Sequence, residues 1–267
     1  DSVQDIVWIE KGENPKGYAK LRKSSSNTEI TAGNSCYSLA GAQYGVFSDR
    51  GCGTQVATLT TDGSGNSDTA SLDAGTYYVK EIKAARGYML DSAVYTIQVA
   101  SGQTAELKVS DEPVISPPLM LYKVDRETRD SVALGAASLD NTQFRVSFYR
   151  GYYTKDNLPA KADRTWVLRA GALEPDRGKN GRAAGNEEQY KVSGDAFYMN
   201  REEMMLPLGT IRVEEIQAPA GYQLDSIYLN SSGTGAAAEK FHIAKVVQNG
   251  NQGVVEDGRK YVVADSV

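Results

Sequence analysis

Six ionisable residues lie in strand-like segments at positions where an apolar side chain is expected. In the segment 17–23, for example, Lys23 follows Ala19 and Leu21 at alternate positions. Successive side chains of a β-strand point to opposite faces, so Lys23 shares the core-facing side with these apolar neighbours. The six residues form two sets of one lysine and two acids: Lys23, Glu81 and Asp111, then Lys123, Glu215 and Asp265. Because an isolated buried charge is too costly to keep, we expect each set to be buried together, as an ion cluster or with a bond between its members.

Short alternating segments separated by Gly, Asn, Asp and Ser predict an all-β chain. The first half holds five of them: Gln43–Phe47, Gln55–Thr60, Thr76–Ile82, Tyr95–Val99 and Ala105–Val109. Regular short strands with turn signals between them are typical of a β-sandwich. The chain has 267 residues, a length that suits about two such domains.

An internal repeat supports two domains. Gly75–Asp91 aligns without gaps to Gly209–Asp225, and 10 of the 17 positions are identical. Between the repeats, three prolines in the six residues from Pro113 to Pro118 favour a stiff, extended connector. The expected organisation is a lead-in over 1–15, a first domain over 16–113, a Pro-rich linker over 114–118 and a second domain over 119–267. The second domain carries insertions, most of them in Tyr152–Gln189.

Charge and composition exclude several classes of function. The net charge of −5 argues against nucleic acid or an anionic membrane as partner. Two cysteines and one histidine leave little for a metal site, so neither a metal nor a cofactor is expected. No run of about 18 apolar residues and no signal peptide is visible. We therefore expect an excised piece of a larger protein, whose secretion signal and anchor lie outside it.

Two motifs recur in the same order in both halves. The first half reads Leu21-x-Lys23 and, later, Glu81-x-x-Ala84-x-x-Gly87-Tyr88; the second reads Leu121-x-Lys123 and Glu215-x-x-Ala218-Pro219-x-Gly221-Tyr222. The chain from about Lys16 to Val267, apart from the insertions, resembles the CnaB-type (SpaA-like, prealbumin-like) isopeptide-forming domains. These domains build Gram-positive pilins and cell-wall-anchored surface adhesins. The resemblance implies two tandem Ig-like, prealbumin-like β-sandwiches in a protein of the bacterial cell surface.

The resemblance also implies a covalent crosslink in each domain. In the family, a lysine of the first strand bonds to an Asn or Asp of the last strand, and a buried Glu or Asp promotes the reaction. Carried over by position, the bonds are Lys23–Asp111 with Glu81, and Lys123–Asp265 with Glu215. Both acceptors here are Asp, so the leaving group is water. The reaction occurs once per molecule, and the chain is therefore not expected to be an enzyme.

Burial makes this chemistry physically reasonable. It disfavours charge, which lowers the pKa of a lysine and raises the pKa of a carboxyl group. The neutral amine is the nucleophile, and a protonated carboxyl is a better electrophile than a carboxylate. The neighbouring Glu can shuttle protons and hydrogen-bond the developing oxyanion. The alternative is a buried, salt-bridged cluster without a bond.

Cys36 and Cys52 flank the Leu39–Phe47 segment. An extracellular setting permits a disulfide between them, which is the expected arrangement. Two free thiols, or an internal Cys–Gln thioester, are the alternatives.

The functional prediction is a structural stalk or backbone region of a surface adhesin or pilin, with neighbouring domains of the same protein as partners. One alternative is a binding module that recognises a glycan or host protein through the insertions of the second domain. Another is an enzyme such as a glycosidase that uses two carboxylates. The position of Glu81 and Glu215 in separate repeats argues against a shared catalytic cleft.

Overall fold

The computed structural model of the chain describes residues 15–128, 133–139, 141–170, 191–229, 236–238, 240–256 and 260–266. Contacts divide these residues into two compact units. The first unit holds residues 15–24, 39–85 and 90–111. The second holds 25–38, 86–89 and the described residues from 112 onward. Most of the predicted lead-in, and residues 171–189 of the predicted insertion, lie outside the described residues.

Nearly every regular element is a strand, which confirms the all-β prediction. In the first half the elements are β1 (Lys16–Ser25), α1 (Thr28–Thr31), β2 (Gln43–Phe47), β3 (Gln55–Thr60), β4 (Ala70–Asp73), β5 (Gly75–Lys83), β6 (Val94–Val99) and β7 (Thr104–Asp111). The following elements are β8 (Ile115–Ser116), β9 (Met120–Asp125), β10 (Thr142–Tyr149), β11 (Arg164–Ala170), β12 (Lys191–Gly194), β13 (Met199–Asn200) and β14 (Glu203–Met204). The last are β15 (Leu206–Pro207), β16 (Gly209–Gln217), β17 (Ile227–Leu229), β18 (Ala236–Ala238), β19 (His242–Asn249), β20 (Gln252–Val255) and β21 (Lys260–Asp265). Within the described residues, no helix has the length and apolar character needed to cross a membrane.

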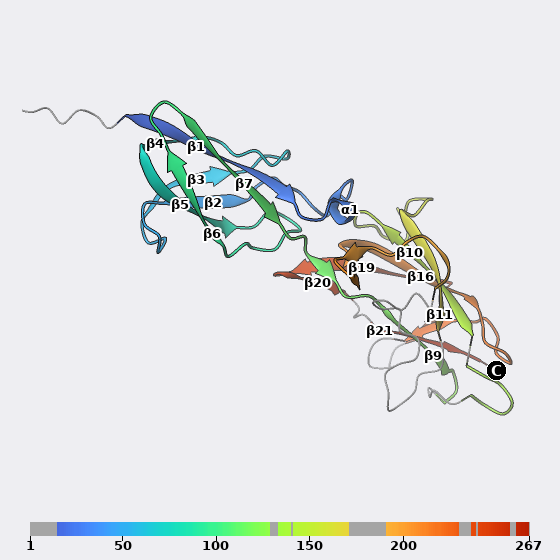
Figure 1. Cartoon of the computed structure of the whole chain (residues 1–267). Helices are drawn as coiled ribbons and strands as arrows, with labels where there is room; N and C mark the ends of the chain where they lie inside the picture. The colour runs from blue at the N-terminus through green and yellow to red at the C-terminus, as the bar shows by residue number, and fades with distance from the viewer. Residues whose placement is uncertain are drawn as a thin grey trace, which may run out of the picture. The chain divides into compact units, whose positions relative to one another are not determined.

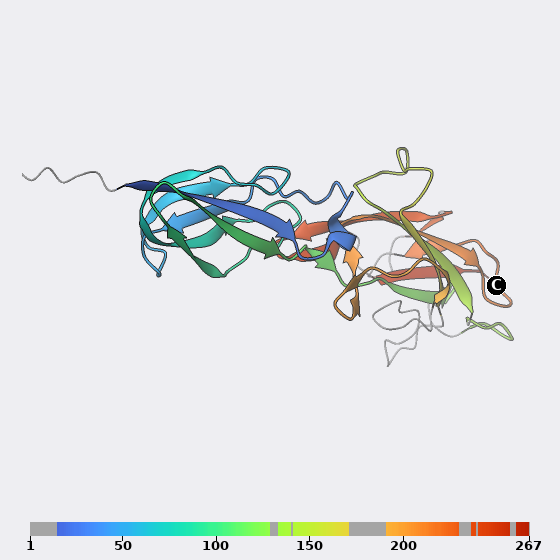
Figure 2. The ribbon, with the colours of Figure 1, turned by 45° about the horizontal axis from the view of Figure 1, so that its top comes forward.

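The first unit is a sandwich of two sheets. One sheet has the strand order β4-β1-β7 and the other β3-β2-β5-β6. The first strand β1 and the last strand β7 lie side by side, as Figures 1 and 2 show from two directions. Strand β1 alternates as predicted, with Ala19, Leu21 and Lys23 buried and the residues between them more exposed. Period-2 burial thus carries the lysine into the core.

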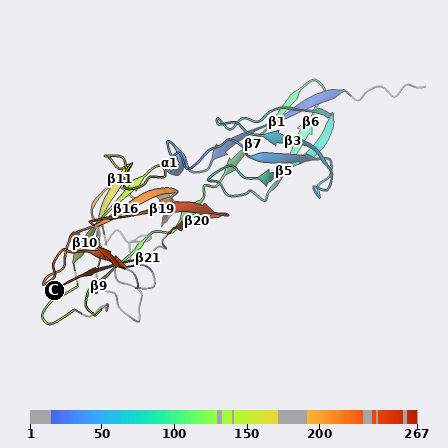
Figure 3. The same ribbon diagram turned by 180° about the vertical axis from the view of Figure 1, so that it is seen from behind.

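The second unit repeats this plan with more strands. Its larger sheet has the order β12-β11-β10-β16-β19-β20, and a second sheet has the order β18-β17-β21-β9. The first and last strands, β9 and β21, pair in parallel, with Lys123 opposite Val263 and Asp125 opposite Asp265 (Figure 3). Trp166 on β11, inside the predicted insertion, is 1% exposed and packs against Phe197, so part of that insertion adds to the core. The prediction of two tandem sandwiches is confirmed.

The same irregularity occurs in both units beside the glutamate. In the first unit β2 pairs with β5, Tyr44 lies opposite Glu81, and the register shifts just before Tyr44. In the second unit β10 pairs with β16, Phe144 lies opposite Glu215, and the register shifts just before Phe144. A bulge bends the strand locally and redirects a side chain. The shared bulge therefore places each glutamate at equivalent points of the two cores.

Candidate functional site

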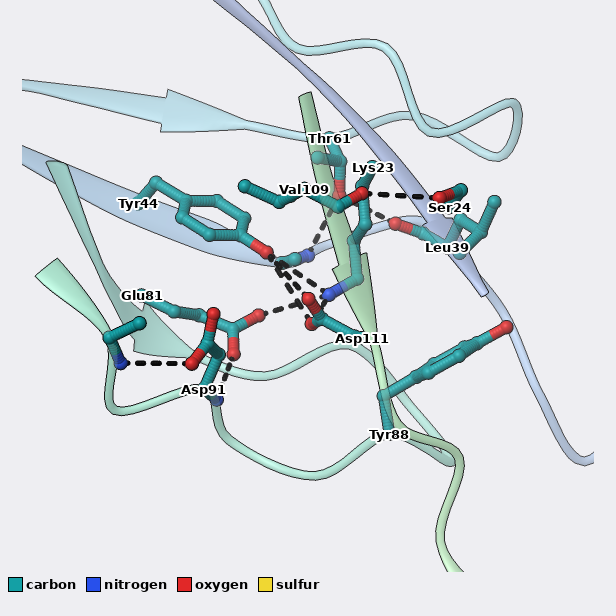
Figure 4. Close-up of polar contacts among 12 residues, drawn as sticks. Lys23, Ser24, Leu39, Tyr44, Thr61, Glu81, Tyr88, Asp91, Val109 and Asp111 are labelled. Atoms are coloured by element: carbon teal, nitrogen blue, oxygen red, sulfur yellow. Dashed lines mark hydrogen bonds and ion pairs between the residues drawn. The ribbon is translucent and has the colours of Figure 1, made fainter. Parts of the chain in front are cut away.

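The structure brings Lys23, Glu81 and Asp111 together in the core of the first unit, in a cluster that we call site 1. They come from three strands: β1, β5 and β7. Each is almost completely buried, with exposed fractions of 1%, 1% and 2%. Figure 4 shows the Glu81 and Asp111 side chains pointing toward the Lys23 nitrogen.

The Lys23 nitrogen has three polar neighbours. It forms an ion pair with Asp111 Oδ2 and lies 3.2 Å from Glu81 Oε1. It also donates a hydrogen bond to the Tyr44 hydroxyl at 3.1 Å. The Tyr44 hydroxyl lies 3.4 Å from each carboxylate oxygen of Asp111. The Lys23 nitrogen and the Asp111 carboxylate are thus in contact, with the Glu81 carboxylate against the nitrogen and the Tyr44 hydroxyl against both.

The loop after β5 holds Glu81 in place. The backbone N–H of Asp91 donates to Glu81 Oε2 at 2.7 Å. The Asp91 carboxylate in turn accepts the Tyr95 hydroxyl at 2.6 Å and the Ala93 N–H at 2.8 Å. One oxygen of Glu81 is therefore fixed by the loop, and the other faces Lys23.

A tight turn fixes the backbone of Lys23. The segment Asp62–Asn66 forms a turn, with the Asp62 carboxylate accepting the N–H groups of Ser64 and Asn66. The Lys23 N–H donates to the Gly65 carbonyl at 2.7 Å. Gly65 has a φ of +82°, and a Cβ there would collide with the Lys23 carbonyl oxygen. Only glycine fits this approach without strain.

Lys123, Glu215 and Asp265 form the corresponding cluster in the second unit, which we call site 2. They lie on β9, β16 and β21 and are 0%, 4% and 0% exposed. The Lys123 nitrogen is 2.6 Å from Asp265 Oδ2 and 2.9 Å from Glu215 Oε1. The structure therefore brings both predicted sets together.

Ser226 takes part in site 2 in two ways. Its hydroxyl donates to Glu215 Oε2 at 2.8 Å, and its backbone N–H donates to Asp265 Oδ1 at 2.9 Å. A backbone N–H aimed at a carboxyl oxygen stabilises negative charge that develops there. The oxygen that faces Lys123 is the other one, Oδ2.

Burial shifts the proton affinities in the direction that the chemistry needs. Burial lowers the pKa of Lys23, and the charge of Glu81 opposes this shift. In site 2, burial raises the pKa of Glu215 to about 7, against the opposing effect of Lys123. In site 1 an amine that loses its proton more readily is a better nucleophile, and in site 2 a Glu215 carboxyl that keeps its proton can donate it.

A pocket of about 520 Å³ lies beside site 2. Glu215, Ser226, Asp225 and Lys240 are among the residues that line it. Within the described parts of the chain, no three His, Cys, Asp or Glu side chains are grouped so that they could hold a metal ion.

The cysteines differ from the predicted arrangement. Cys36 and Cys52 are both free, and no disulfide joins them. Cys36 is buried within the second unit, and this burial raises the pKa of its thiol. Cys52 belongs to the first unit and its sulfur lies 3.9 Å from the Arg50 carbonyl oxygen. The segment around Cys36 folds with the second unit, whereas Cys52 folds with the first.

Tyr44, Asp91 and Ser226 contact the predicted residues but were not among them. Alternation in Gln43–Phe47 puts Tyr44 on a core-facing side, yet the second copy has Phe144 at the paired position, so the repeat does not mark it. Asp91 is identical in both copies of the repeat, which is a signal that could have found it.

Comparison with known proteins agrees with the sequence motifs. Residues 17–113 match the SpaA family, a prealbumin-like fold domain, which confirms the family resemblance of the first domain. A search of curated proteins found no match.

Several solved structures are similar to the chain. The Bacillus anthracis TIE protein is 18% identical with a TM-score of 0.48, over 94% of this chain and 51% of that one. A C-terminal fragment of the pilus adhesin SpaC from Lactobacillus rhamnosus GG is 16% identical with a TM-score of 0.42, over 94% and 98%. The streptococcal ancillary pilin is 20% identical with a TM-score of 0.31, over 96% and 63%. The chain thus spans about half the length of the TIE protein.

Proposed function

We propose that this chain is a structural stalk or backbone region of a Gram-positive surface adhesin or pilin, and that sites 1 and 2 each form an intramolecular Lys–Asp isopeptide bond. The SpaA prealbumin-like domain at residues 17–113 supports the class of protein. One observation carries the proposal: in each unit a buried lysine of the first strand contacts a buried aspartate of the last strand, with a buried glutamate beside both.

The reaction is a condensation. The neutral lysine nitrogen attacks Cγ of the aspartic acid, a C–N bond forms, and a C–O bond breaks. The nitrogen loses one hydrogen, the glutamate carries this proton to the departing hydroxyl of the aspartic acid, and the two leave together as water. Folding holds the reacting groups in contact, which replaces a bimolecular encounter by a high effective concentration. No external cofactor or energy source enters the balance.

The bonds have a mechanical consequence. In each unit they join the two strands that lie nearest to the ends of the domain sequence, β1 to β7 and β9 to β21. Tension applied to the chain then passes from one strand to the other through a covalent bond, and the sandwich cannot be pulled apart strand by strand. Such a domain suits a cell-surface stalk under shear, anchored through a region outside this chain and connected to neighbouring domains.

The intact mass of the reduced chain tests the proposal. Two condensations lower the mass by about 36 Da, about 18 Da for each water lost. Lys23→Ala and Lys123→Ala should each remove one loss of about 18 Da. A mass equal to that of the unmodified sequence would leave both sites as buried ion clusters and refute the crosslinks.

A further inference from the structure

The two sites differ at one position that touches the reacting groups. In site 1 the Tyr44 hydroxyl contacts the Lys23 nitrogen and both oxygens of Asp111. The strand position paired with the glutamate is Tyr44 in the first unit and Phe144 in the second. A phenylalanine has no hydroxyl to offer, so the two crosslinks must handle their protons differently.

The Tyr44 hydroxyl is placed to accept and donate at the same time. It accepts a hydrogen bond from Lys23 Nζ at 3.1 Å, and its own hydrogen can be donated to Asp111 at 3.4 Å. A phenol has one donor and free lone pairs, which allows both bonds together. Tyr44 is 0% exposed, so bulk water does not compete for either bond.

We propose, on the basis of the isopeptide chemistry above, that Tyr44 is a catalytic residue of site 1 that relays a proton from Lys23 to Asp111. The ammonium gives a proton to the phenol oxygen while the phenol gives its own proton to the carboxylate. The products are a neutral amine, a neutral carboxylic acid and an unchanged phenol. The neutral Lys23 amine and the neutral Asp111 carboxylic acid are the protonation states that nucleophilic attack requires, and they form without placing a net charge on Tyr44.

The surroundings keep the phenol neutral between transfers. Burial raises the pKa of Tyr44 well above its ordinary range, and the charge of Glu81 and a hydrogen bond to the Glu81 carboxylate, the second acceptor within reach of the hydroxyl, raise it further. A tyrosinate is therefore not populated, and the hydroxyl keeps the hydrogen that the relay needs. After attack, the same hydroxyl can donate to the oxyanion that develops on Asp111.

Site 2 uses another arrangement, which makes the relay specific to site 1. Lys123 Nζ lies 2.6 Å from Asp265 Oδ2, and the Ser226 N–H is the donor at Oδ1. Glu215, held by the Ser226 hydroxyl, is the remaining proton carrier. Formation of the second bond therefore serves as an internal control for formation of the first bond in the same molecule.

The test is Tyr44→Phe in the full chain, which removes the hydroxyl and keeps the ring. The chain is collected unfolded in urea before either bond has formed, refolded by dilution, and quenched at intervals. Branched tryptic peptides containing Lys23 or Lys123 then report the two bonds separately by mass spectrometry. The relay predicts that the first bond forms about 100–10,000-fold more slowly than in the parent, the range of a lost acid–base group, while the second keeps its parental rate.

Tyr77→Phe is the matched control. It removes another tyrosine hydroxyl from the same unit, one that donates to the Asp73 carbonyl at 3.0 Å, and both bonds should form at the parental rate. Parental rates in Tyr44→Phe overturn the relay and leave the proposed function intact. A first-bond rate that only follows slower folding, measured by near-UV circular dichroism on the same samples, also overturns it. If the parent forms neither bond, the proposed function itself fails.

Discussion

Replacing Glu81 by Gln isolates what the first crosslink contributes to stability. The substitution keeps the size of the side chain and leaves the Lys23–Asp111 ion pair in the core, but it removes the carboxyl group that carries the proton. We expect the first bond to be lost and the second to form. The mass deficit should fall from about 36 to about 18 Da.

The size of the effect follows from the loop that the bond closes. Lys23 and Asp111 are 88 residues apart. By analogy with a disulfide, closing a loop of this length in the unfolded chain stabilises the domain by about 4–5 kcal/mol. For a domain of about 60–100 residues, each kcal/mol corresponds to about 4–8 °C in Tm. The first domain should therefore unfold about 16–40 °C lower in Glu81→Gln, since the remaining buried ion pair adds little net stability.

Calorimetry of the parent and the variant measures this shift, and Glu106→Gln is the matched control. Glu106 on β7 pairs with Lys20 on β1 at 2.8 Å, so it links the same two strands through a partly exposed ion pair. Such pairs contribute about 0–1 kcal/mol, and Glu106→Gln should keep the full mass deficit and nearly the parental Tm. Two results would refute the reasoning: Glu81→Gln that still loses about 36 Da, or loss of the bond with an unchanged Tm.

Four further predictions concern the two sites. Glu215→Gln should abolish only the second bond, so that branched peptides contain Lys23 but not Lys123. Asp111→Asn should still crosslink, with ammonia as the leaving group, and the first condensation should then remove about 17 Da instead of about 18 Da, which high-resolution mass spectrometry separates. Burial raises the pKa of Glu215 to about 7, so its carboxyl loses its proton above that pH. In timed refolding, formation of the second bond should therefore slow about tenfold per pH unit above pH 7. A flat profile of rate against pH from pH 6 to 9 would contradict the role of Glu215. Gly65→Ala should slow formation of the first bond and lower the Tm of the first domain. The added Cβ collides with the Lys23 carbonyl oxygen, and Gly65 has a left-handed φ of +82° that alanine adopts only with strain. An unchanged rate of formation of the branched peptide that contains Lys23 would contradict this prediction.

Much of the fold and the six clustered residues could be predicted because strand alternation is a strong local signal. The predicted segments Gln43–Phe47 and Gln55–Thr60 coincide with β2 and β3. Alternation also places Lys23, Val79 and Glu81 on buried faces, as observed. A buried charge needs a partner of opposite charge. Because each half of the internal repeat holds one lysine and two acids at core-facing positions, the residues could be grouped into two sets of three.

The contacts around the six residues could not be predicted in the same way, because they depend on register between strands. The bulge before Tyr44 sets which β2 residue lies opposite Glu81, and alternation within one strand contains no information about that shift. Ser226 depends on a loop conformation with a φ of 25°, which neither its own residue type nor its neighbours predict. The disulfide prediction relied on proximity in sequence, whereas both cysteines are free in the structure and residues 25–38, which include Cys36, fold with the second unit.

The exposed turn at Asp62, Gly63 and Ser64 lies between Lys23 and Asp111 in the sequence. With the proposed bond in place, residues 23–111 form a closed covalent ring, and two covalent paths connect these positions: the backbone and the crosslink. A protease that cuts the turn opens the ring but leaves one molecule, which keeps its connection through the isopeptide bond and runs as a branched chain on a denaturing gel. Continuity of the chain across this domain is then lost only when both paths are broken. A single nick, which would release everything distal to it in an ordinary domain, releases nothing here.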